Sequence, residues 1–302
     1  KHHQPKQFID FGNWTLFGKT LDRVKNSIFD YPIITTNLNY LRLVKKYLLK
    51  NKIKKYKIIL EPSKKNTAPA ILSPALLKDI PDEQPMVFFS ADNLLSNVKK
   101  FNKSISIYKR YLNDDNIFIF GIKPISFSSA YGYFLSKRNL QGIDKVYKFI
   151  EKPKKNKLNL IIKKKGYMNS GMFFIRKDSI IKNFKKYQKK LYKNCELAIN
   201  KSRNNKNIYY LNKFNFNKIK EISFDYAVLE KSKNINAIKL NISLADLGNW
   251  KEIWRFFKKN NSIKSIKKNT FYRPWGKYIN LFHGKGFLLK ELVINARSSI
   301  SL

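Results

Sequence analysis

Three polar residues near the middle of the chain have types and spacing suited to binding a sugar phosphate. Glu151 and Lys152 follow an apolar, β-prone run that a proline must end, so we expect them at the tip of a strand. Asn169 lies in a polar turn that Gly171 makes flexible, just before a second β-prone run at Met172–Ile175. Carboxylate and amide groups can bind hydroxyls, and an ammonium group can bind phosphate. The spacing alone more simply indicates two hairpin loops that carry solvated charges.

Other polar residues follow predicted strands in the same way. The strand predicted at Tyr56–Leu60 leads to Glu61, and the apolar strand predicted at Met86–Phe89 leads to Asp92. Strands alternate with helical segments along the chain, which predicts a mostly parallel sheet with ligands at the carboxyl ends of its strands. From the residues alone, Asp92 or Asn93 could simply cap the helix that follows.

Composition by itself would suggest a different class of protein. The 302 residues include 62 Lys plus Arg and 20 Asp plus Glu, and a net charge of +42 is typical of proteins that bind nucleic acid or anionic membranes. The excess is mainly lysine and is spread along the chain, whereas arginine is the better bidentate ligand of phosphates and bases. A lineage-wide codon bias explains this composition more simply.

The apolar content is sufficient for one large domain or two smaller ones, since 43% of the residues are hydrophobic and 15% are aromatic. No apolar run approaches the ~20 residues that a membrane span needs. Cys195 is the single cysteine, so no intrachain disulfide can form, and His2, His3 and His283 are not spaced as a metal site. We therefore predict a cytoplasmic protein with neither a membrane nor a specific nucleic acid as partner.

Several motifs together resemble the mannose-1-phosphate guanylyltransferases, the enzymes that make GDP-mannose. F-I-E-K-P at Phe149–Pro153 and N-S-G-M-F at Asn169–Phe173 resemble the sugar-binding core of that family. Further matches follow in the family's order: P-K-Q-F at Pro5–Phe8, E-P-S-K-K-N-T-A-P-A at Glu61–Ala70, S-A-D-N at Ser90–Asn93, Y-G-Y at Tyr131–Tyr133, F-D-Y-A-V-L-E-K at Phe224–Lys231, A-D-L-G-N-W at Ala245–Trp250 and Y-R-P-W-G-K-Y at Tyr272–Tyr278. The chain is similar in particular to the family members that also carry a mannose-6-phosphate isomerase domain.

The resemblance implies an α/β fold, namely a Rossmann-like, GT-A-like nucleotidyltransferase domain with a mostly parallel sheet and helices on both faces. Residues 1–259 would form this domain, residues 260–270 a linker, and residues 271–302 the beginning of a β-rich, cupin-like isomerase domain. The family's first strand and glycine-rich phosphate loop would lie upstream of Pro5, and the isomerase histidines beyond Leu302. We therefore expect a chain that is truncated at both ends.

The resemblance also implies a reaction, in which the phosphate of α-D-mannose 1-phosphate attacks the α-phosphorus of GTP and pyrophosphate leaves. Mg²⁺ would be bound by Asp92 and Asp246, and the catalytic cations would be Lys6 and Lys152. No general base is needed, because the attacking oxygen is already ionised.

Substrate contacts are implied for residues of the same motifs. Candidates for binding the sugar phosphate are Tyr131, Gly132, Glu151, Asn169 and Gly171. Candidates for binding guanine and ribose are Glu61, Asn66 and Thr67. The resemblance places the helix that starts near Ser223 beside the sugar, where Ser223 or Asp225 could act as its cap, and it is compatible with a homo-oligomer.

Two other functions remain open at this point. A nucleotidyltransferase of the same fold that uses another hexose 1-phosphate or another base would share most of these motifs, and a lysine at position 65, where the family commonly has arginine, leaves base selectivity unsettled. From a different class, a chain with a charge of +42 could bind nucleic acid or a membrane surface without catalysis.

Overall fold

The computed structural model describes residues 5–10, 14–124, 127–140, 142–246, 270–284 and 287–300. Its contacts divide the chain into a main unit, residues 21–90 and 95–244, and a second unit, residues 1–20, 91–94 and 245–302. The α-helices are α1 (Leu16–Arg23), α2 (Leu41–Lys50), α3 (Thr67–Ala75), α4 (Val98–Tyr108), α5 (Lys155–Lys163), α6 (Lys177–Tyr187), α7 (Lys189–Asn200) and α8 (Lys213–Asn217). Shorter helical turns are η1 (Lys6–Phe8), η2 (Leu38–Tyr40), η3 (Lys109–Tyr111) and the π-helical η4 (Asp225–Leu229).

The strands are β1 (Ile33–Asn37), β2 (Lys57–Glu61), β3 (Pro85–Phe88), β4 (Asn93–Leu95), β5 (Ile117–Ile122), β6 (Tyr133–Arg138), β7 (Asp144–Ile150), β8 (Tyr167–Arg176), β9 (Arg203–Asn205), β10 (Ile208–Tyr210), β11 (Ile235–Leu240), β12 (Leu244–Asp246), β13 (Thr270–Arg273), β14 (Gly276–Gly284) and β15 (Phe287–Ile294). The strands predicted before Glu61 and before Asp92 are therefore present as β2 and β3. None of the described helices has the length and apolar character that a membrane span requires.

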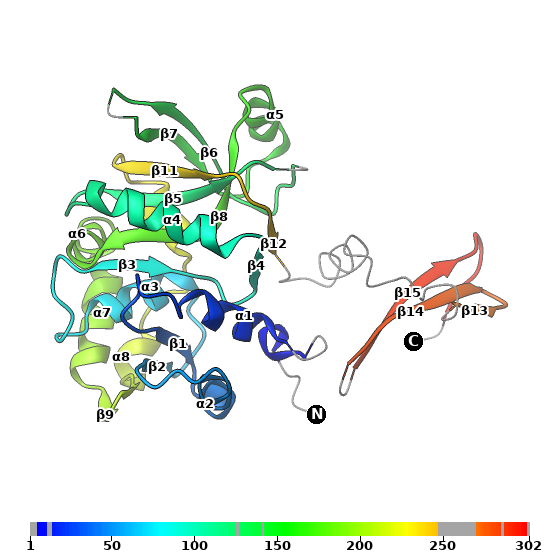
Figure 1. The fold of residues 1–302 in the computed structure, drawn as a ribbon, viewed down its shortest axis with the longest axis horizontal. Helices are drawn as coiled ribbons and strands as arrows, with labels where there is room; N and C mark the ends of the chain where they lie inside the picture. Colours follow the sequence, from blue (N-terminus) through cyan, green and yellow to red (C-terminus); the bar gives the residue numbers. More distant parts are fainter. Residues whose placement is uncertain are drawn as a thin grey trace. The chain divides into compact units, whose positions relative to one another are not determined.

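Two sheets form the frame of the main unit (Figure 1). One has the strand order β1-β2-β10-β9 and the other the order β3-β8-β5-β11-β7-β6. Because β6 also pairs with β8, the strands β8, β5, β11, β7 and β6 form a closed ring. Among the described strands, β1 pairs only with β2 and β3 only with β8, so each of these two has one open edge.

The prediction of a mostly parallel sheet was wrong, because the sheets are mixed. The parallel pairs are β1–β2, β2–β10 and β5–β11, whereas β8 runs antiparallel between β3 and β5. The tight connection between β6 and β7 makes them an antiparallel hairpin, and β8 begins where β5 ends, with Asn169 opposite Gly121, so it must run back along β5. The predicted class of α/β fold is nevertheless the one observed.

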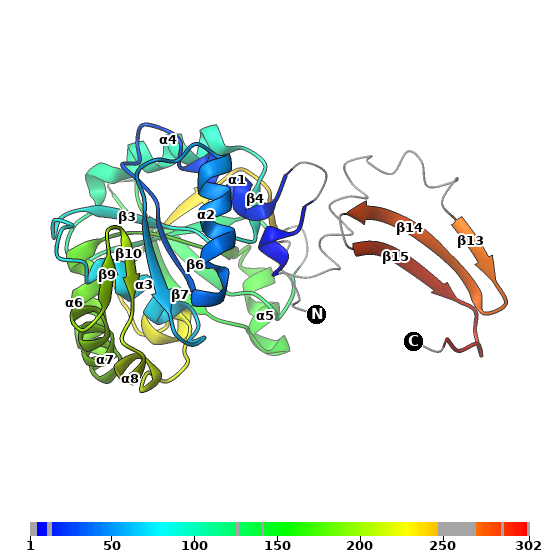
Figure 2. The same cartoon turned by 90° about the horizontal axis from the view of Figure 1, so that it is seen from below.

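Helices cover both faces of the larger sheet, as predicted (Figure 2). On one face Ile117 and Ile119 of β5 belong to a core cluster with residues of α3, α6 and α7. The intervening Phe118 and Phe120 belong to a cluster on the other face, which includes Phe101 of α4. Because successive side chains of a strand point to opposite faces, a strand that is buried along its whole length must be covered on both.

The second unit contains the turn η1 and a small antiparallel sheet made of β13, β14 and β15. Phe8 of η1 is buried and contacts the ring of Phe17 at a centroid distance of 5.2 Å. In the small sheet several apolar side chains are exposed, with exposed fractions from 39% for Phe271 to 75% for Tyr272. The predicted linker lies outside the described residues apart from Thr270, and the assignment of this sheet to an isomerase domain stays a prediction.

Candidate active site

The predicted sugar-binding residues meet where β6 begins, β7 ends and β8 begins. The pairing of β6 with both β7 and β8 brings Gly132, Glu151 and Asn169 together. The N–H of Asn169 donates to the carbonyl oxygen of Gly132 at 2.9 Å. A Cβ atom on residue 132 would collide with Oε2 of Glu151, so a larger residue there would require this carboxylate to move. We call this group, with Lys152 and Asp225, the sugar-phosphate corner.

Two carboxyl groups in this corner ionise near neutral pH. The pKa of Glu151 is raised to about 7, mainly by burial and also by the charges of Asp225 and Glu230, while Lys152 opposes the rise. Burial also raises the pKa of Asp225 to about 6, against the lowering effect of its own backbone N–H, of Lys152 and of the Asn169 amide. Nδ2 of Asn169 donates to Oδ1 of Asp225 at 2.9 Å. The corner therefore offers several hydrogen-bonding oxygens beside one ammonium group.

Two backbone conformations shape the corner. Lys152 has a φ of 45°, in the left-handed region that costs a non-glycine residue about 1 kcal/mol or more. Gly171 has a φ of 69°, which favours glycine, and the space where its Cβ would lie contains no atom within 4 Å. The two conformations turn the chain sharply after β7 and within β8.

Asp225 and Glu230 lie at the corner but were not among the predicted site residues. Asp225 does not act as the helix cap considered above, because its carboxylate accepts from Asn169, while Ser223 Oγ accepts from the N–H of Tyr226 at 3.3 Å. Glu230 follows η4, and its Oε1 accepts from the N–H of Glu151 at 3.0 Å. The sequence signal that could have identified them is their spacing in F-D-Y-A-V-L-E-K, where Asp225 begins η4 and Glu230 directly follows it.

Glu61, a predicted nucleotide contact, ends β2 with its side chain directed inward. Its Oε1 is enclosed and has no hydrogen-bond partner among the described residues, and burial raises the pKa of this carboxyl group to about 7. Burial raises the pKa of the Cys195 thiol on α7, and the charge of Glu61 adds to that rise. The enclosed Oε1 is therefore not accessible to a ligand.

Asn66 and Thr67, the other predicted nucleotide contacts, form the start of α3. Asn66 has φ 67° and ψ −167°, a combination that is essentially restricted to glycine, and its side chain accepts from the N–H of Thr67 at 2.9 Å. The next N–H, of Ala68, donates to the carbonyl oxygen of Ile222 at 3.2 Å, and Pro69 has none. The first three residues of α3 therefore leave no N–H for a phosphate, although a helix N-terminus would otherwise attract one.

The predicted metal ligands lie next to or on two paired strands: Asp92 comes one residue before β4, and Asp246 is the last residue of β12. Strands β4 and β12 pair, and the N–H of Ser96, just after β4, donates to the carbonyl oxygen of Ser243, just before β12, at 3.0 Å. The strands are therefore antiparallel, which brings the backbone of Asp246 opposite Asn93 and next to Asp92. The metal site made of Asp92 and Asp246 stays a prediction, and no group of three or more His, Cys, Asp or Glu side chains that could hold a metal ion occurs in the part of the chain that the structure describes.

The alternative in which Asp92 or Asn93 caps the next helix is wrong. Asn93 belongs to strand β4, and α4 begins only at Val98. The cap of α4 is Asn97, whose side chain accepts from the N–H of Lys100 at 2.9 Å. Asp92 therefore has no part in starting that helix.

The last two predicted site residues occupy different units. Lys6 begins η1 in the second unit, whereas Tyr131 is partly buried in the main unit and packs against the small cluster of Tyr133, Ile150 and Ile161. Tyr131 therefore packs against residues at the start of β6 and the end of β7. Its role as a direct contact of the sugar phosphate stays a prediction.

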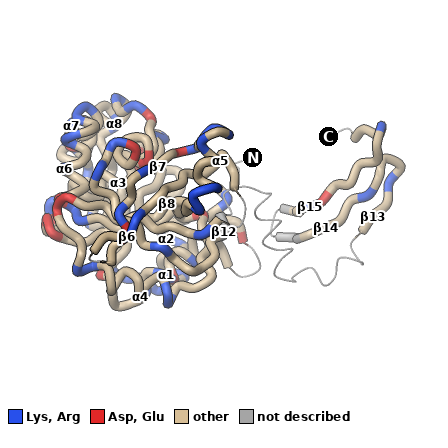
Figure 3. The backbone as a smooth tube through the Cα atoms, turned by 90° about the horizontal axis from the view of Figure 1, so that it is seen from above, with Lys and Arg blue, Asp and Glu red and all other residues tan. Residues whose placement is uncertain are grey.

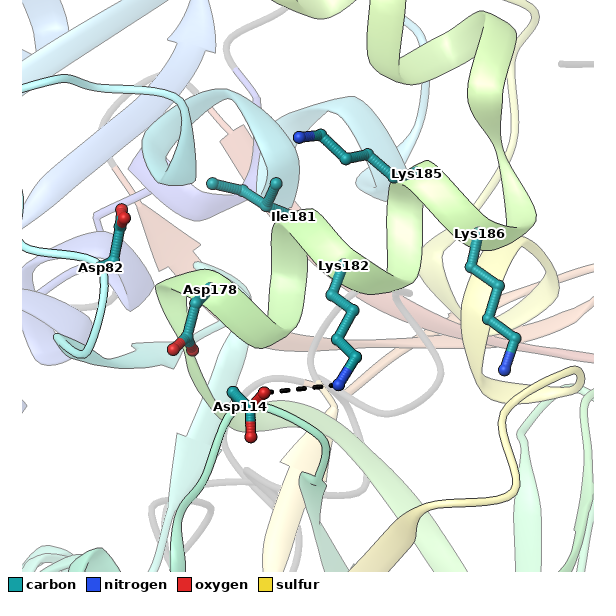
Figure 4. A pocket seen from close by; sticks show the side chains of 7 residues that line it. All are labelled: Asp82, Asp114, Asp178, Ile181, Lys182, Lys185 and Lys186. Atoms are coloured by element: carbon teal, nitrogen blue, oxygen red, sulfur yellow. Dashed lines mark hydrogen bonds and ion pairs between the residues drawn. The ribbon is translucent and has the colours of Figure 1, made fainter.

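A surface hollow lies away from these residues, at the start of α6 (Figure 4). It is lined by Asp82, Asp114 and Asp178 and by Lys182 with other residues of α6. Asp82 and Asp114 come just before β3 and β5, whereas the candidate ligands follow strand ends. Lys182 lies 3.3 Å from Asp114 and 3.2 Å from Asp115, so the charges of the hollow largely compensate each other. No residue of the candidate site lines it.

The chain is similar in sequence to several known proteins. The chain is 27% identical over 294 residues to the alginate biosynthesis protein AlgA of Pseudomonas putida, an alignment that covers 95% of this chain and 60% of that protein. It is 29% identical over 287 residues to a mannose-1-phosphate guanylyltransferase of Salmonella muenchen, covering 92% of this chain and 60% of that protein. The chain thus spans about three fifths of the length of these two relatives.

A solved structure and a family model extend the comparison. The crystal structure of mannose-6-phosphate isomerase from Helicobacter pylori matches with a TM-score of 0.72 and 28% identity, covering 80% of this chain and 94% of that chain. The family model described as nucleotidyl transferase matches residues 2–262. The resemblance stated from the motifs and the predicted nucleotidyltransferase fold are both confirmed, and members of this family generally use a divalent metal ion. The chain belongs to the nucleotidyl transferase family.

Proposed function

We propose that this chain transfers GMP from GTP to α-D-mannose 1-phosphate and so forms GDP-mannose and pyrophosphate. The observation that carries the proposal is the sugar-phosphate corner, in which Glu151, Asn169 and Asp225 gather hydrogen-bonding groups beside the ammonium of Lys152. A sugar phosphate carries the complementary groups: its hydroxyls can bind the carboxyl and amide groups, and its phosphate can bind the ammonium. The name of the Salmonella relative, mannose-1-phosphate guanylyltransferase, supports the choice of substrates.

The chemistry requires that two anions approach each other. The phosphate oxygen of the sugar is already ionised, so the chain has only to orient it and to balance its charge, which Lys152 and Lys6 would do. Asp92 and Asp246 would hold Mg²⁺, which when bound supplies positive charge to the triphosphate. Glu61 and Asn66 are proposed contacts of the guanosine, with Oε2 of Glu61 accepting from an N–H group of the base.

The distribution of charge supports a small-molecule substrate over a nucleic acid. Lys and Arg residues are spread over many helices and strands of the main unit, among them α2, α4, α6 and α7, and are not collected in one stripe (Figure 3). A sequence-reading protein concentrates such charge on the element that enters a groove. We therefore attach no specific nucleic acid, and no membrane, to this chain.

Calorimetric titration with sugar phosphates tests the proposal at the corner itself. Mannose 1-phosphate is expected to bind more tightly than glucose 1-phosphate, because the acceptors of the corner must distinguish the orientation of single hydroxyls. Pyrophosphate release measured with GTP, UTP, CTP and ATP in turn then tests the base. Equal affinity for both sugars and equal rates with all four nucleotides would favour the broader hexose-1-phosphate alternative, and tight, salt-sensitive binding of one DNA sequence would favour a nucleic-acid binder.

A further inference from the structure

The hydrogen bonds around Thr67 indicate a role that neither the motifs nor the comparisons assign. We propose that Thr67 is a positioning residue for the sugar-phosphate corner, acting through the segment Ser223–Glu230, and that it is not a contact of the nucleotide. The inference rests on the proposed function, because it concerns the same sugar-phosphate site.

The first observation is a set of hydrogen bonds that fastens the loop Ser63–Ala68 to the segment Asn217–Phe224. The partners are Ser63 Oγ with Asn217 Oδ1 (2.7 Å), Lys65 Nζ with the carbonyl oxygen of Asn217 (3.0 Å), the N–H of Ile222 with the carbonyl oxygen of Lys65 (3.3 Å), the N–H of Ala68 with the carbonyl oxygen of Ile222 (3.2 Å), Asn66 Nδ2 with Glu221 Oε1 (3.4 Å), and the N–H of Phe224 with Thr67 Oγ1 (2.9 Å). We call this set the clamp. Two segments about 150 residues apart in the sequence thus behave as one piece of structure.

The bond of Thr67 is the member of the clamp nearest to the corner. It holds Phe224, the residue directly before η4, whose side chain is 1% exposed and whose ring packs against Phe173 at 4.9 Å and Phe184 at 6.0 Å. Because Phe224 is buried, its N–H cannot turn to water if the threonine oxygen is removed. The beginning of η4 is therefore fixed from two directions, by the ring contacts and by this hydrogen bond.

The second observation is that η4 is tied to the corner at both of its ends. Asp225 opens the turn and accepts from Asn169, and Glu230 follows the turn and accepts from the N–H of Glu151. In the middle of the turn, the carbonyl oxygen of Ala227 accepts from Nε2 of Gln188 at 3.1 Å. A π-helical turn is rare and is held in place by such contacts. A displaced start of η4 would therefore move the groups that meet the sugar.

Removing the acceptor oxygen of Thr67 provides the test. Thr67→Val keeps the shape of the side chain and leaves the N–H of Phe224 without a partner. A buried N–H that loses its partner should lower the population of the native arrangement of η4, relative to displaced ones, about tenfold or more. Thr67→Ser keeps the acceptor. A matched control is Thr35→Val, because the hydroxyl of Thr35 donates to the carbonyl oxygen of Ala70 on the same helix α3 at 3.3 Å but does not touch the clamp.

Calorimetry is to be carried out on the whole chain with mannose 1-phosphate and, separately, with GTP. We expect Thr67→Val to weaken binding of mannose 1-phosphate about tenfold and that of GTP less than about twofold, while Thr67→Ser and Thr35→Val bind both as the unchanged chain does. Hydrogen exchange of the amides of residues 224–229 should be faster in Thr67→Val alone. A loss of GTP affinity with unchanged sugar-phosphate affinity would overturn the proposal and make Thr67 a nucleotide contact.

Hydrogen exchange separates this proposal from the proposed function. If the unchanged chain bound neither ligand, the proposed function would fail, and exchange would still decide whether Thr67 holds η4. Unaltered exchange of residues 224–229 in Thr67→Val would refute the positioning role whatever the chain binds.

Discussion

Replacing Glu61 by glutamine tests the electrostatics of the site in a measurable way. The substitution Glu61→Gln keeps the size of the side chain and removes its ionisation. In the folded chain burial raises the pKa of this group to about 7 from an ordinary value of 4.5, and its Oε1 has no partner among the described residues. Each pKa unit corresponds to about 1.4 kcal/mol, so the ionised carboxylate destabilises the folded state by about 3 kcal/mol above pH 7.

The sign of the effect follows from the direction of the shift. Because the pKa is higher in the folded state, the stability that the neutral carboxyl group contributes is fully present below about pH 4.5 and is lost as the pH rises through about 7. Glutamine does not ionise and shows no such loss. We therefore expect Glu61→Gln to match the unchanged chain near pH 4.5 and to be more stable by about 2–3 kcal/mol at pH 8.5.

Urea denaturation followed by circular dichroism from pH 4.5 to pH 8.5 measures this difference. Glu151 and Asp225, whose pKa values burial also raises, ionise in both proteins, so their contributions cancel when the two curves are subtracted. Glu83→Gln, which replaces an exposed carboxylate, is the matched control. The difference in unfolding free energy between this variant and the unchanged chain should not vary with pH. A difference between Glu61→Gln and the unchanged chain that does not vary with pH would refute the reasoning.

Two further predictions concern the metal site and the sugar-phosphate corner. Asp92→Asn or Asp246→Asn should lower the rate of pyrophosphate release about a hundredfold or more while affecting mannose 1-phosphate affinity less; near-full activity at saturating Mg²⁺ would remove that residue from the metal site. Lys152→Ala should weaken calorimetric binding of mannose and glucose 1-phosphates alike, about tenfold, whereas Glu151→Ala should mainly reduce the preference between them, and equal losses for both sugars from Glu151→Ala would count against its hydroxyl contacts.

The local features of the fold could be predicted from the sequence, because they depend on neighbouring residues. The strands before Glu61 and Asp92 were predicted correctly from short apolar runs, and the position of Glu151 at a strand end from the proline that follows Lys152. The direction of β8 could not be predicted, since a strand's partner depends on residues far away in the sequence, and the pattern of one strand is the same in either direction.

The composition of the site was predictable only in part. Motif resemblance identified the residues that meet at the corner, but Asp225 was interpreted as a helix cap because aspartate is common at caps. Its carboxylate turns toward Asn169 because η4 is a π-helical turn, which the sequence does not signal. The inward direction of the Glu61 side chain was also hidden, because a charged residue after a strand is normally expected to face solvent.

The closed ring of β8, β5, β11, β7 and β6 has a consequence for how rigid the two halves of the site are. Each strand of the ring has neighbours on both sides, so local opening must break two ladders at once, whereas β1 can separate from β2 by breaking one. The sugar-phosphate corner lies at the ends of ring strands, and Glu61 ends β2 in the open-edged sheet. A sugar phosphate should therefore meet a surface that is already formed. Glu61 is held in a similar way, since β2 pairs with both β1 and β10, and the open edge of that sheet lies one strand away, at β1.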